Sequence, residues 1–520
     1  MTAPSAETAP LPARTLGALV GAAGGAWRCA APDPATPVAA LAEDSRKVAA
    51  GTIFAALPGT RVHGADFVPY ALRQDALAIV IDPADLARAE KAAGMPADAW
   101  PAPVLLAETP RRWLALAAAA FWAAQPGVMA AVTGTNGKTS TAHFLREIWA
   151  FAGHRAANLG TTGIEGDGFE AEGRLTTPEP LILHPMLADL AARGCTHAAM
   201  ETSSHGLAQH RADGVRLAAA ALTHITRDHL DYHASFQDYV AAKLRLFGGV
   251  LPAGGTAVLN VDDPSFAEAR ALAQARGQAV IATGRGEDAD LRILEQRFAP
   301  AGQRVVFGWA EARYACELSL IGAFQAENVA TAAALALATD VPADTVFDAL
   351  AHLTTVRGRM ERAGTRTTGA AVYVDYAHTP DALVSALKSI RPHATGRLVV
   401  VFGAGGDRDP GKRPLMGRAA GEGADVAILT DDNPRSEPPA AIRAAVREGC
   451  PDAIEIGGRA EANLAGVDAL EGPGDLLLIA GKGHEQGQEI AGEIHPFDDA
   501  EQARAAIAAL DGLDALEDEA

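Results

Sequence analysis

Cysteine is scarce in this chain, with only four among 520 residues. These cysteines lie far apart and form no CxxC pair: Cys29, Cys195, Cys316 and Cys450. A disulfide framework or a cysteine-based zinc site needs a regular cysteine pattern, so the sequence argues against both. The same scarcity is typical of proteins in a reducing compartment, and we therefore expect a cytoplasmic protein.

Long apolar runs and an excess of positive charge are also lacking. The apolar run 113–124 is too short to span a bilayer, and the N-terminus has no basic-then-apolar signal pattern, so we expect no membrane insertion. The net charge of −20 argues against nucleic-acid binding. An anionic ligand must therefore meet a local basic cluster. Our expectation for the oligomeric state is a monomer.

Strand-like apolar runs alternate with alanine-rich helical stretches. The clearest strands are 128–132, 197–200, 218–222, 256–260, 371–374, 398–402, 426–429 and 476–480. This alternation predicts α/β layers with mostly parallel sheets. Gln125-Pro126-Gly127 marks one boundary, and a second lies near Arg357-Gly358, where a helical run from about 327 to 353 ends. We predict three domains, over residues 1–125, 126–357 and 358–520.

The most informative motif is Val132-Thr-Gly-Thr-Asn-Gly-Lys-Thr-Ser140, which follows a strand-like run and precedes an expected helix from about 141 to 151. Its glycines allow backbone N–H groups to converge on phosphate oxygens. Lys138 can reach the terminal phosphates, and the hydroxyl of Thr139 or Ser140 can bind Mg²⁺. Because Val132 stands where the standard pattern has glycine, this is a shortened phosphate loop. The motif predicts a nucleotide triphosphate site.

Two polar clusters follow this loop. Glu201, in Glu201-Thr-Ser-Ser-His-Gly-Leu207, comes at a strand end and can bind the Mg²⁺ of the nucleotide, while Ser203 can contact a substrate. The histidine-rich segment 224–233 is compatible with zinc, but carboxylates beside a triphosphate favour Mg²⁺. Lys243 lies in a helical stretch and, by default, is a solvated surface lysine.

The last third of the chain has polar loops after four expected strands. Arg359 can stabilise phosphate charge, and Asp375 at a strand end can hold a ribose hydroxyl or the nucleotide. The segment 401–413 is glycine-rich, but Arg408 replaces the third glycine of a dinucleotide fingerprint, which opposes a nicotinamide site. Loops 431–437 and 481–485 offer Arg, Asn and Glu side chains that can grip the carboxylate and ammonium groups of an amino acid.

Read in order, TGTNGKTS, ETSSHG, HLDYH with its later lysine, GRME, DYAHTPDAL and GxGGDRDxGKR resemble the Mur ligase family of ATP-dependent amide-bond enzymes. The resemblance runs from about residue 44 to 500. It implies an N-terminal α/β domain that binds a UDP sugar, a central P-loop ATPase domain with a mostly parallel sheet, and a C-terminal Rossmann-like domain that delivers an amino acid. Within the family, DDNPR at 431–435 is similar to the members that add meso-2,6-diaminopimelate to UDP-N-acetylmuramoyl-L-alanyl-D-glutamate.

The resemblance also implies roles for individual residues. Contacts to the UDP-muramoyl-dipeptide fall on Ser45, Thr176, Thr177, Ser203, Gln209 and Arg211. Contacts to ATP fall on Gly134, Thr135, Asn136, Gly137, Lys138, Thr139, Ser140, Asn328, Arg359 and Asp375. Contacts to diaminopimelate fall on Arg408, Asp432, Asn433, Pro434, Arg435, Gly481 and Glu485. Lys243 matches the family lysine that becomes a carbamate (N6-carboxylysine) and binds a second Mg²⁺, with His229 as co-ligand. Lys138, Lys243 and His229 are the expected catalytic residues, and Thr139, Glu201, His229 and Lys243 the metal ligands.

The expected chemistry is ATP-dependent amide formation through an acyl phosphate. Gln325, where relatives often carry Asn, is a departure with little effect because Asn328 remains. The lysine-adding sister ligase and a folylpolyglutamate-type ligase are alternatives: Asn433 and Arg435 oppose the first, and Asp44-Ser-Arg46 opposes the second. A P-loop GTPase switch lacks support because no Asn-Lys-x-Asp motif occurs. A non-catalytic UDP-sugar-binding protein remains a further alternative.

Overall fold

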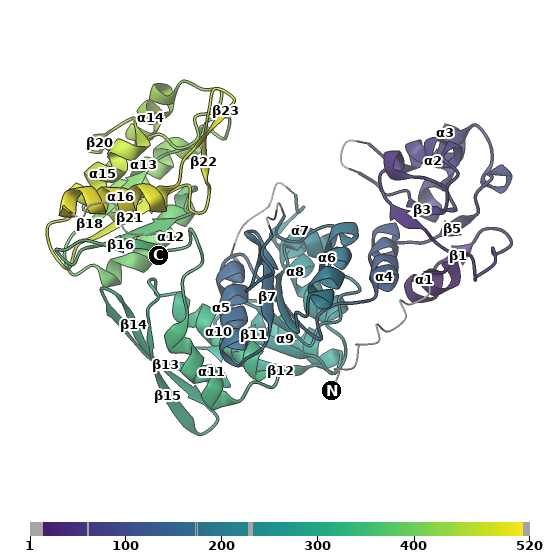
Figure 1. Ribbon diagram of the computed structural model, residues 1–520, viewed down its shortest axis with the longest axis horizontal. Helices are drawn as coiled ribbons and strands as arrows, with labels where there is room; N and C mark the ends of the chain where they lie inside the picture. Colours follow the sequence, from purple (N-terminus) through teal and green to yellow (C-terminus); the bar gives the residue numbers. More distant parts are fainter. Residues whose placement is uncertain (1–13, 60–61, 172, 174, 227–231, 513–520) are drawn as a thin grey trace, which may run out of the picture. The chain divides into compact units, whose positions relative to one another are not determined.

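The computed structural model describes residues 14–512 except 60–61, 172, 174 and 227–231 (Figure 1). The chain forms two compact units, each of which draws on several segments. The first comprises residues 1–138, 153–259 and 263–280, and the second comprises 139–152, 260–262 and 281–520. The three domains expected from the sequence, with their two boundaries, stay a prediction.

The first unit contains two sheets with their flanking helices. Its strands are β1 (Ala26–Trp27), β2 (Ala40–Ala42), β3 (Thr52–Ala55), β4 (Ala78–Ile81), β5 (Val104–Leu106), β6 (Val128–Thr133), β7 (Ala156–Gly160), β8 (Gly163–Glu165), β9 (His197–Glu201), β10 (Ala219–Leu222) and β11 (Thr256–Asn260). Its α-helices are α1 (Leu16–Ala23), α2 (Val68–Arg73), α3 (Leu86–Ala93), α4 (Pro110–Trp122), α6 (Pro180–Ala192), α7 (Ser204–Ala208), α8 (Phe236–Arg245) and α9 (Phe266–Ala275). Short 3-10 turns are η1 (Ser45–Lys47), η2 (Gly64–Phe67), η3 (Pro83–Asp85) and η4 (Ala97–Ala99), and η5 (Leu246–Val250) is a π-helix.

The two sheets of this unit are mostly parallel. In the first, the order is β1-β5-β4-β3-β2, and only β1 runs antiparallel to its neighbour. In the second, the consecutive strands β11-β10-β6-β9-β7 are parallel, and β8 is antiparallel to β7. Strands β6, β9 and β10 are apolar and almost wholly buried, as expected for strands covered on both faces. Their carboxyl ends therefore open at one edge of the sheet.

The second unit contains helix α5 (Lys138–Phe151) from its second residue onward, an antiparallel meander and a six-stranded sheet. The meander is β13 (Leu291–Ala299), β14 (Gly302–Trp309) and β15 (Ala312–Leu318), and β12 (Ala279–Gly284) crosses from one unit to the other. The remaining strands are β16 (Glu361–Thr365), β17 (Ala371–Asp375), β18 (Leu398–Phe402), β19 (Val426–Leu429), β20 (Ile454–Glu455), β21 (Leu476–Ala480), β22 (Gly487–Ile490) and β23 (Glu493–Pro496). The helices are α10 (Gln325–Leu337), α11 (Ala343–Ala349), η6 (Leu350–His352), α12 (Pro380–Ile390), η7 (Arg391–His393), α13 (Lys412–Gly423), α14 (Pro439–Arg447), α15 (Arg459–Asp468) and α16 (Asp499–Asp511).

The six-stranded sheet has the order β16-β17-β21-β18-β19-β20. All of its pairings are parallel except that of β16 with β17. The loops that follow β17, β18, β19 and β21 therefore meet at the same edge, and these are the loops in which the sequence placed its polar clusters. The hairpin β22–β23 lies beside them.

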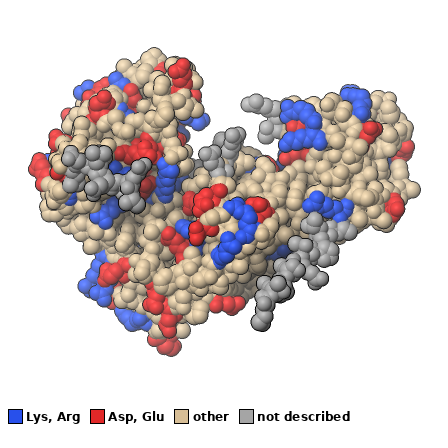
Figure 2. Space-filling model, in the orientation of Figure 1, with Lys and Arg blue, Asp and Glu red and all other residues tan. Residues whose placement is uncertain are grey.

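The predicted fold class, α/β with mostly parallel sheets, is confirmed, and all eight predicted strands are present with small shifts at their ends. The single helical run over 327–353 is wrong. It breaks between α10 and α11, where Pro342 precedes the second helix and cannot continue the first. Figure 2 shows acidic and basic side chains interspersed on the visible face. Among the described residues, no helix is long and apolar enough to cross a membrane.

Candidate active site

The phosphate loop begins where β6 ends. Gly134 and Gly137 have positive φ angles of 148° and 84°, which favour glycine. A Cβ at Gly134 would collide with the hydroxyl of Thr223, and that hydroxyl donates to the carbonyl of Asn136 over 2.6 Å. Thr223 at the end of β10 thus fixes the loop, and helix α5 starts directly after it at Lys138.

Two lysines converge on this loop. The Nζ of Lys138 donates to the carbonyl oxygens of Gly134 (3.0 Å) and Thr135 (2.8 Å). The Nζ of Lys243 donates to the same Gly134 oxygen over 2.8 Å. Lys243 is 2 % exposed, so its default reading as a solvated surface lysine is wrong.

Helix α8 explains why Lys243 points inward. Ser235 caps the helix by accepting a hydrogen bond from the N–H of Asp238 over 3.1 Å. Tyr239 and Lys243 are four residues apart, so they share one helix face. The Tyr239 hydroxyl lies 2.8 Å from that of Thr135, and the Lys243 Nζ lies 4.6 Å from the Tyr239 ring centre. Buried Tyr239 four residues before the lysine is the sequence signal for an inward lysine.

Glu201 is the last residue of β9, one strand from the phosphate loop. It pairs in register with Val132, just before the loop, and is 2 % exposed. Its carboxylate accepts hydrogen bonds from the N–H of Thr161 (2.9 Å) and from the Thr161 hydroxyl (3.4 Å). A Cβ at Gly160 would overlap the carboxylate, so the glycine leaves space for it. Glu201 is therefore a buried oxygen donor at the same sheet edge.

Five of the six residues predicted to bind the UDP-muramoyl-dipeptide lie in a chain of hydrogen bonds. The hydroxyl of Thr177 lies 3.2 Å from that of Ser203, and the Arg211 guanidinium donates to the Thr177 carbonyl (2.9 Å) and to Gln209 Oε1 (2.7 Å). The Thr176 hydroxyl lies 3.0 Å from that of Thr161, which donates to the Glu201 carboxylate, and the Glu201 carbonyl accepts from Thr177. These side chains form one polar surface beside the carboxyl end of β9.

The sixth residue, Ser45, lies in turn η1 after β2 and is buried. No hydrogen bond between Ser45 and the other five occurs within the described parts of the chain. The charge of Arg211, one of those five residues, nevertheless acts on the segment that carries Ser45. Burial raises the pKa of the neighbouring Glu43, Glu179 raises it further, and Arg211 lowers it.

In the segment after β10, a half-exposed histidine contacts a buried carboxylate. The Nδ1 of His224 lies 2.9 Å from Asp263 Oδ2, which also accepts from the N–H of Ile225 over 2.6 Å. Burial opposes the charged form of Asp263, but these bonds outweigh it and lower its pKa. The predicted ligand His229 lies outside the described residues. Within the described residues, no group of three His, Cys, Asp or Glu side chains is arranged for a metal ion.

The predicted ATP contacts are divided between the two units. The loop residues up to Lys138 belong to the first unit, whereas Thr139, Ser140, Asn328, Arg359 and Asp375 belong to the second. Asn328 lies on α10, where its Nδ2 donates to Gln325 Oε1 over 3.0 Å, so the departure at Gln325 supports Asn328 directly.

Asp375 and Arg359 are neighbours at the end of β17. The Asp375 carboxylate accepts from the N–H groups of Met360 and Ala377, both over 2.9 Å. Burial raises the pKa of Asp375, and the Arg359 charge opposes that rise. The Arg359 guanidinium lies 4.8 Å from the Tyr376 ring centre.

The loops after β19 and β21 bring the predicted amino-acid contacts together. Asn433 Nδ2 donates to Glu485 Oε2 over 2.9 Å. Arg435 Nε donates to Glu489 Oε2 (3.1 Å), and its Nη1 donates to the Gly406 carbonyl (2.8 Å). The backbone of Arg435 also joins hairpin β22–β23, because its N–H donates to the Glu489 carbonyl over 3.0 Å.

The remaining predicted contacts border this group. Gly481 has a φ of 123°, and a Cβ there would collide with the Asp432 carboxylate. Pro434 places its carbonyl against Gly406, where a Cβ would also collide. Arg408 is exposed, and a Cβ built on Gly405 would lie 3.0 Å from Arg435 Nη1 and 3.9 Å from Arg408 Cγ. The loops after β18, β19 and β21 thus supply one continuous charged surface.

Tyr376 joins this surface to Arg359. Its pKa is raised mainly by burial and then by the charge of Glu485, whereas Arg359 and Arg408 lower it. A Cβ at Gly358 would collide with the backbone of Gly483 and His484. The loop that carries Arg359 is therefore packed on the loop that carries Glu485.

Sequence reasoning missed three residues of these surfaces. Thr161 donates to Glu201, Glu489 accepts from Arg435, and Lys482 is a wholly buried lysine beside Asn433. The two glycines that flank Lys482 are its only sequence signal, because they allow a close turn.

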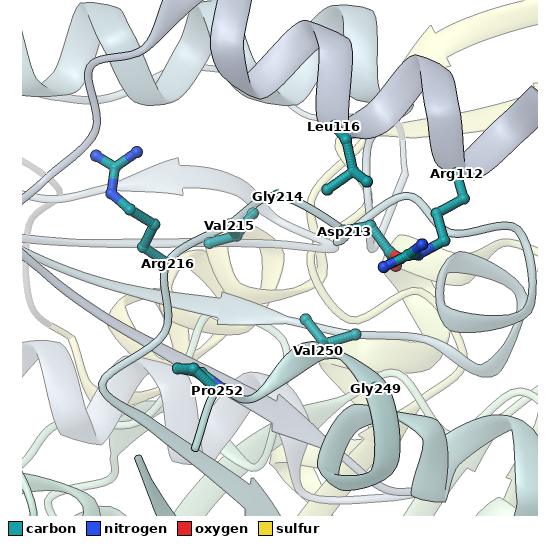
Figure 3. A pocket seen from close by; sticks show the side chains of 9 residues that line it. All are labelled: Arg112, Leu116, Asp213, Gly214, Val215, Arg216, Gly249, Val250 and Pro252. Carbon is teal, nitrogen blue, oxygen red and sulfur yellow. The ribbon is translucent and has the colours of Figure 1, made fainter. Parts of the chain in front are cut away.

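A separate pocket of about 450 Å³ lies beside helix α4 (Figure 3). Arg112 points toward Asp213, and their Nε and Oδ2 atoms are 3.2 Å apart. In this view, the Arg216 side chain lies on the opposite side of the pocket from Arg112. None of the described residues predicted for the substrate sites lines this pocket.

Comparison with known families matches three segments of the chain. Residues 38–122 match the Mur ligase family catalytic domain, 132–336 the Mur ligase middle domain, and 358–483 the Mur ligase glutamate ligase domain. Together these segments cover most of the chain and include both the phosphate loop and the loops after β18 and β19.

Curated relatives match over nearly the whole length. The UDP-N-acetylmuramoyl-L-alanyl-D-glutamate–2,6-diaminopimelate ligase of Caulobacter vibrioides is 48 % identical, over 92 % of this chain and 96 % of the relative. The ligase of the same name from Bradyrhizobium diazoefficiens is also 48 % identical, over 91 % and 96 %.

Solved structures also match nearly the whole chain. A UDP-N-acetylmuramoyl-L-alanyl-D-glutamate–2,6-diaminopimelate ligase, 34 % identical, superposes with a TM-score of 0.71 over 93 % of this chain and 97 % of that chain. The MurF ligase from Thermotoga maritima in complex with ADP, 17 % identical, shares the fold with a TM-score of 0.56 over 90 % and 97 %. The chain belongs to the Mur ligase family.

Proposed function

We propose that this chain is an ATP-dependent ligase that joins meso-2,6-diaminopimelate to the D-glutamyl γ-carboxylate of UDP-N-acetylmuramoyl-L-alanyl-D-glutamate. The amino-acid surface carries the proposal, because Asn433, Arg435 and Glu485 lie together at one sheet edge. The names and near-complete coverage of the relatives support the same substrates. Such a ligase supplies precursors of peptidoglycan in the cytoplasm, and we propose that it acts as a monomer.

The phosphate loop and Lys138 would hold ATP. Loop N–H groups and the Lys138 ammonium neutralise the charge that builds up on the terminal phosphate. Residues Asn328, Arg359 and Asp375 would contact the rest of the nucleotide. The fixed shape of the loop, held by Thr223, keeps these donors in place.

The donor set of the site fits Mg²⁺. Glu201 presents a buried carboxylate at the sheet edge beside the loop, and Thr139 follows Lys138 with a hydroxyl. Hard oxygen donors of this kind, together with phosphate oxygens, are what Mg²⁺ prefers. When bound, Mg²⁺ would draw negative charge from the phosphates.

We propose that Lys243 is carbamylated. As an ammonium it shares the Gly134 carbonyl with Lys138, which brings two like charges to one acceptor. A carbamate at Lys243 would replace that repulsion by attraction to Lys138 and would add an anionic oxygen donor for a second Mg²⁺. His229, outside the described residues, remains its proposed co-ligand.

The reaction has two steps. A γ-carboxylate oxygen attacks the γ-phosphorus of ATP, the bond from this phosphorus to the β–γ bridging oxygen breaks, and ADP leaves. The neutral amine of diaminopimelate then attacks the acyl carbon, loses a proton, and expels phosphate with the electrons of the C–O bond. The surface of Thr176, Thr177, Ser203, Gln209 and Arg211 would orient the dipeptide for both steps.

Arg435 favours diaminopimelate over lysine, the substrate of the sister ligase. The two amino acids differ mainly by a distal carboxylate, which a guanidinium binds with two parallel hydrogen bonds. Glu489 accepts from Arg435 Nε and the Gly406 carbonyl accepts one N–H of Nη1, so the second N–H of Nη1 and the Nη2 group would bind the carboxylate. Folylpolyglutamate synthases share the fold at 20 % identity or less, and a likeness at this level concerns the fold alone.

Phosphate release from ATP tests this proposal. We expect release only when UDP-muramoyl-dipeptide and meso-diaminopimelate are both present, with a tripeptide product detected by mass spectrometry. Release with nucleotide alone would favour a nucleotide switch. Release supported equally by lysine would favour the sister ligase.

A further inference from the structure

Lys482 is a wholly buried lysine that none of the proposed substrate contacts includes. Its side chain is 0 % exposed, and its Nζ donates to Asn433 Oδ1 over 2.8 Å and to the Gly487 carbonyl over 2.6 Å. The Glu485 carboxylate lies 3.6 Å away. Burying an ammonium is costly unless its hydrogen bonds are satisfied, so these bonds account for its stability there.

Carboxylates around Lys482 offset part of the cost of burying its ammonium group. Burial lowers the pKa of Lys482 and the Arg459 charge lowers it further, whereas the carboxylates of Asp432 and Glu485 oppose this effect. Both carboxylates belong to the proposed amino-acid surface. The lysine thus lies beneath that surface and balances part of its negative charge.

The partners of Asn433 fix which way its amide faces. An ammonium has only donors, and so has the N–H of Glu489, which lies 2.9 Å from Asn433 Oδ1. The amide oxygen must therefore face Lys482 and Glu489. The Nδ2 group must face Glu485, whose carboxylate only accepts, over 2.9 Å.

We propose that Lys482 is a positioning residue that sets the polarity of the amino-acid surface through Asn433. This inference rests on the proposed function. With its oxygen held and one N–H on Glu485, the Asn433 amide turns its second N–H to the ligand. Glu485, held at one oxygen, offers the other as an acceptor. One donor and one acceptor side by side match the carboxylate and ammonium groups that an amino-acid carbon carries.

The test compares Lys482→Met with the matched control Lys388→Met, since Lys388 is exposed on α12 in the same unit. We expect Lys482→Met to raise KM for diaminopimelate about 10- to 100-fold, as for loss of a charge-assisted hydrogen bond. The KM values for ATP and UDP-muramoyl-dipeptide should change less than about threefold, because the proposed contacts of these two substrates do not include Asn433. Parallel rises for all three substrates would overturn the proposal.

A double-mutant cycle shows whether Lys482 acts through Asn433. In an Asn433→Ala background, Lys482→Met should change KM for diaminopimelate by less than about threefold, because the amide that it orients is gone. Additive effects would mean that Lys482 acts by another route, and the proposal would fail.

Two polar variants replace Lys482→Met if it gives no cooperative melting transition. Lys482→Arg keeps a cationic donor and Lys482→Gln only a neutral one, so KM for diaminopimelate should be lower with arginine. Equal values would overturn the proposal. The wild-type chain is assayed first: if its phosphate release does not depend on diaminopimelate, the proposed function itself fails, whereas normal wild-type activity with unaffected variants rejects only the role of Lys482.

Discussion

The phosphate loop and the amino-acid surface place their cations differently. At the loop, Lys138 and Lys243 both donate to the main-chain carbonyl of Gly134. At the amino-acid surface, Lys482 donates to the Asn433 side chain and Arg435 to the Glu489 side chain, and each also donates to a main-chain carbonyl. The Asn433 side chain in turn donates to the Glu485 carboxylate.

This difference follows from the ligands that the two regions would bind. A triphosphate presents only acceptors. The loop that binds it therefore needs positive charge and N–H donors, but no fixed order of donors and acceptors. A diamino acid presents donors and acceptors at both ends, so its site must fix which group faces which. Substitutions at the loop should therefore reduce kcat, whereas substitutions at the amino-acid surface should raise KM.

The loop substitution Lys138→Ala should have the largest effect. Loss of its charge removes stabilisation of the phosphate in the transition state, and kcat should fall about 10²- to 10³-fold. Lys138 lies at the end of the loop, and its Nζ donates to two loop carbonyls, so the melting temperature should stay close to that of wild type. Steady-state phosphate release measures the effect, with Lys91→Ala on helix α3 as an exposed control. Near-normal kcat would remove the phosphate-loop assignment.

The variant Lys243→Ala should lose activity about 10²-fold and regain part of it with added short-chain carboxylates. If the side chain works as a carbamate, a small carboxylate can take the place of its anionic group. Mass spectrometry of the intact wild-type chain should show the added CO₂ mass under native conditions. Lys138→Ala is the matched control and should not respond to carboxylates. Equal responses of both variants would reject the carbamate.

Much of the fold was predictable because strands covered on both faces are continuous apolar runs. Strands β11, β18, β19 and β21 have the predicted bounds for this reason. The break between α10 and α11 was missed because alanine-rich sequence on both sides of Pro342 hides a short loop. The antiparallel meander β13–β15 was also missed, since its strands mix exposed and buried residues with no continuous apolar run.

The candidate site was predictable where glycine spacing and strand ends coincide, as at Gly134 and Glu201. It was not predictable where a charged residue is buried. The local signals are weak: Tyr239 one helical turn before Lys243, and the two glycines that flank Lys482. The burial of Lys482 also depends on Asn433, which lies on another loop.

At the amino-acid surface, Arg435→Ala should cut use of diaminopimelate about 10- to 100-fold, at about 1.4 kcal/mol per factor of ten. The substitution removes the guanidinium that would bind the distal carboxylate, and it should leave KM for ATP nearly unchanged. Kinetics with diaminopimelate and lysine at saturating ATP and UDP-muramoyl-dipeptide measure the preference. Arg391→Ala, which removes an exposed ion pair with Asp425, is the control. An unchanged preference would mean that Arg435 does not select diaminopimelate, and the proposed difference between the two regions would be wrong.

Buried histidine in the first unit should give the smallest effect, seen as pH dependence of stability. Burial lowers the pKa of His184 to about 4, whereas an unfolded histidine titrates near 6.5. Above about pH 6.5 both states are neutral. As pH falls from about 6.5 to 4 only the unfolded state binds the proton, so the free energy of unfolding drops by up to about 1.4 kcal/mol per pH unit.

Lys482 is buried beside carboxylates, whereas His184 is buried against a main-chain carbonyl. The Nε2 of His184 donates to the Asp213 carbonyl over 3.3 Å. The neutral ring already makes this bond, so protonation adds charge but no hydrogen bond to this carbonyl. Urea unfolding at pH 7.5 and 5.0 should show a smaller loss of stability for His184→Gln than for wild type, since glutamine does not titrate. Burial also lowers the pKa of His197 to about 4. This histidine remains in the variant, so part of the pH dependence of stability should remain as well. Equal losses in the two proteins would mean that His184 is already charged in the folded chain, and that the first unit tolerates a buried charge as the amino-acid surface does.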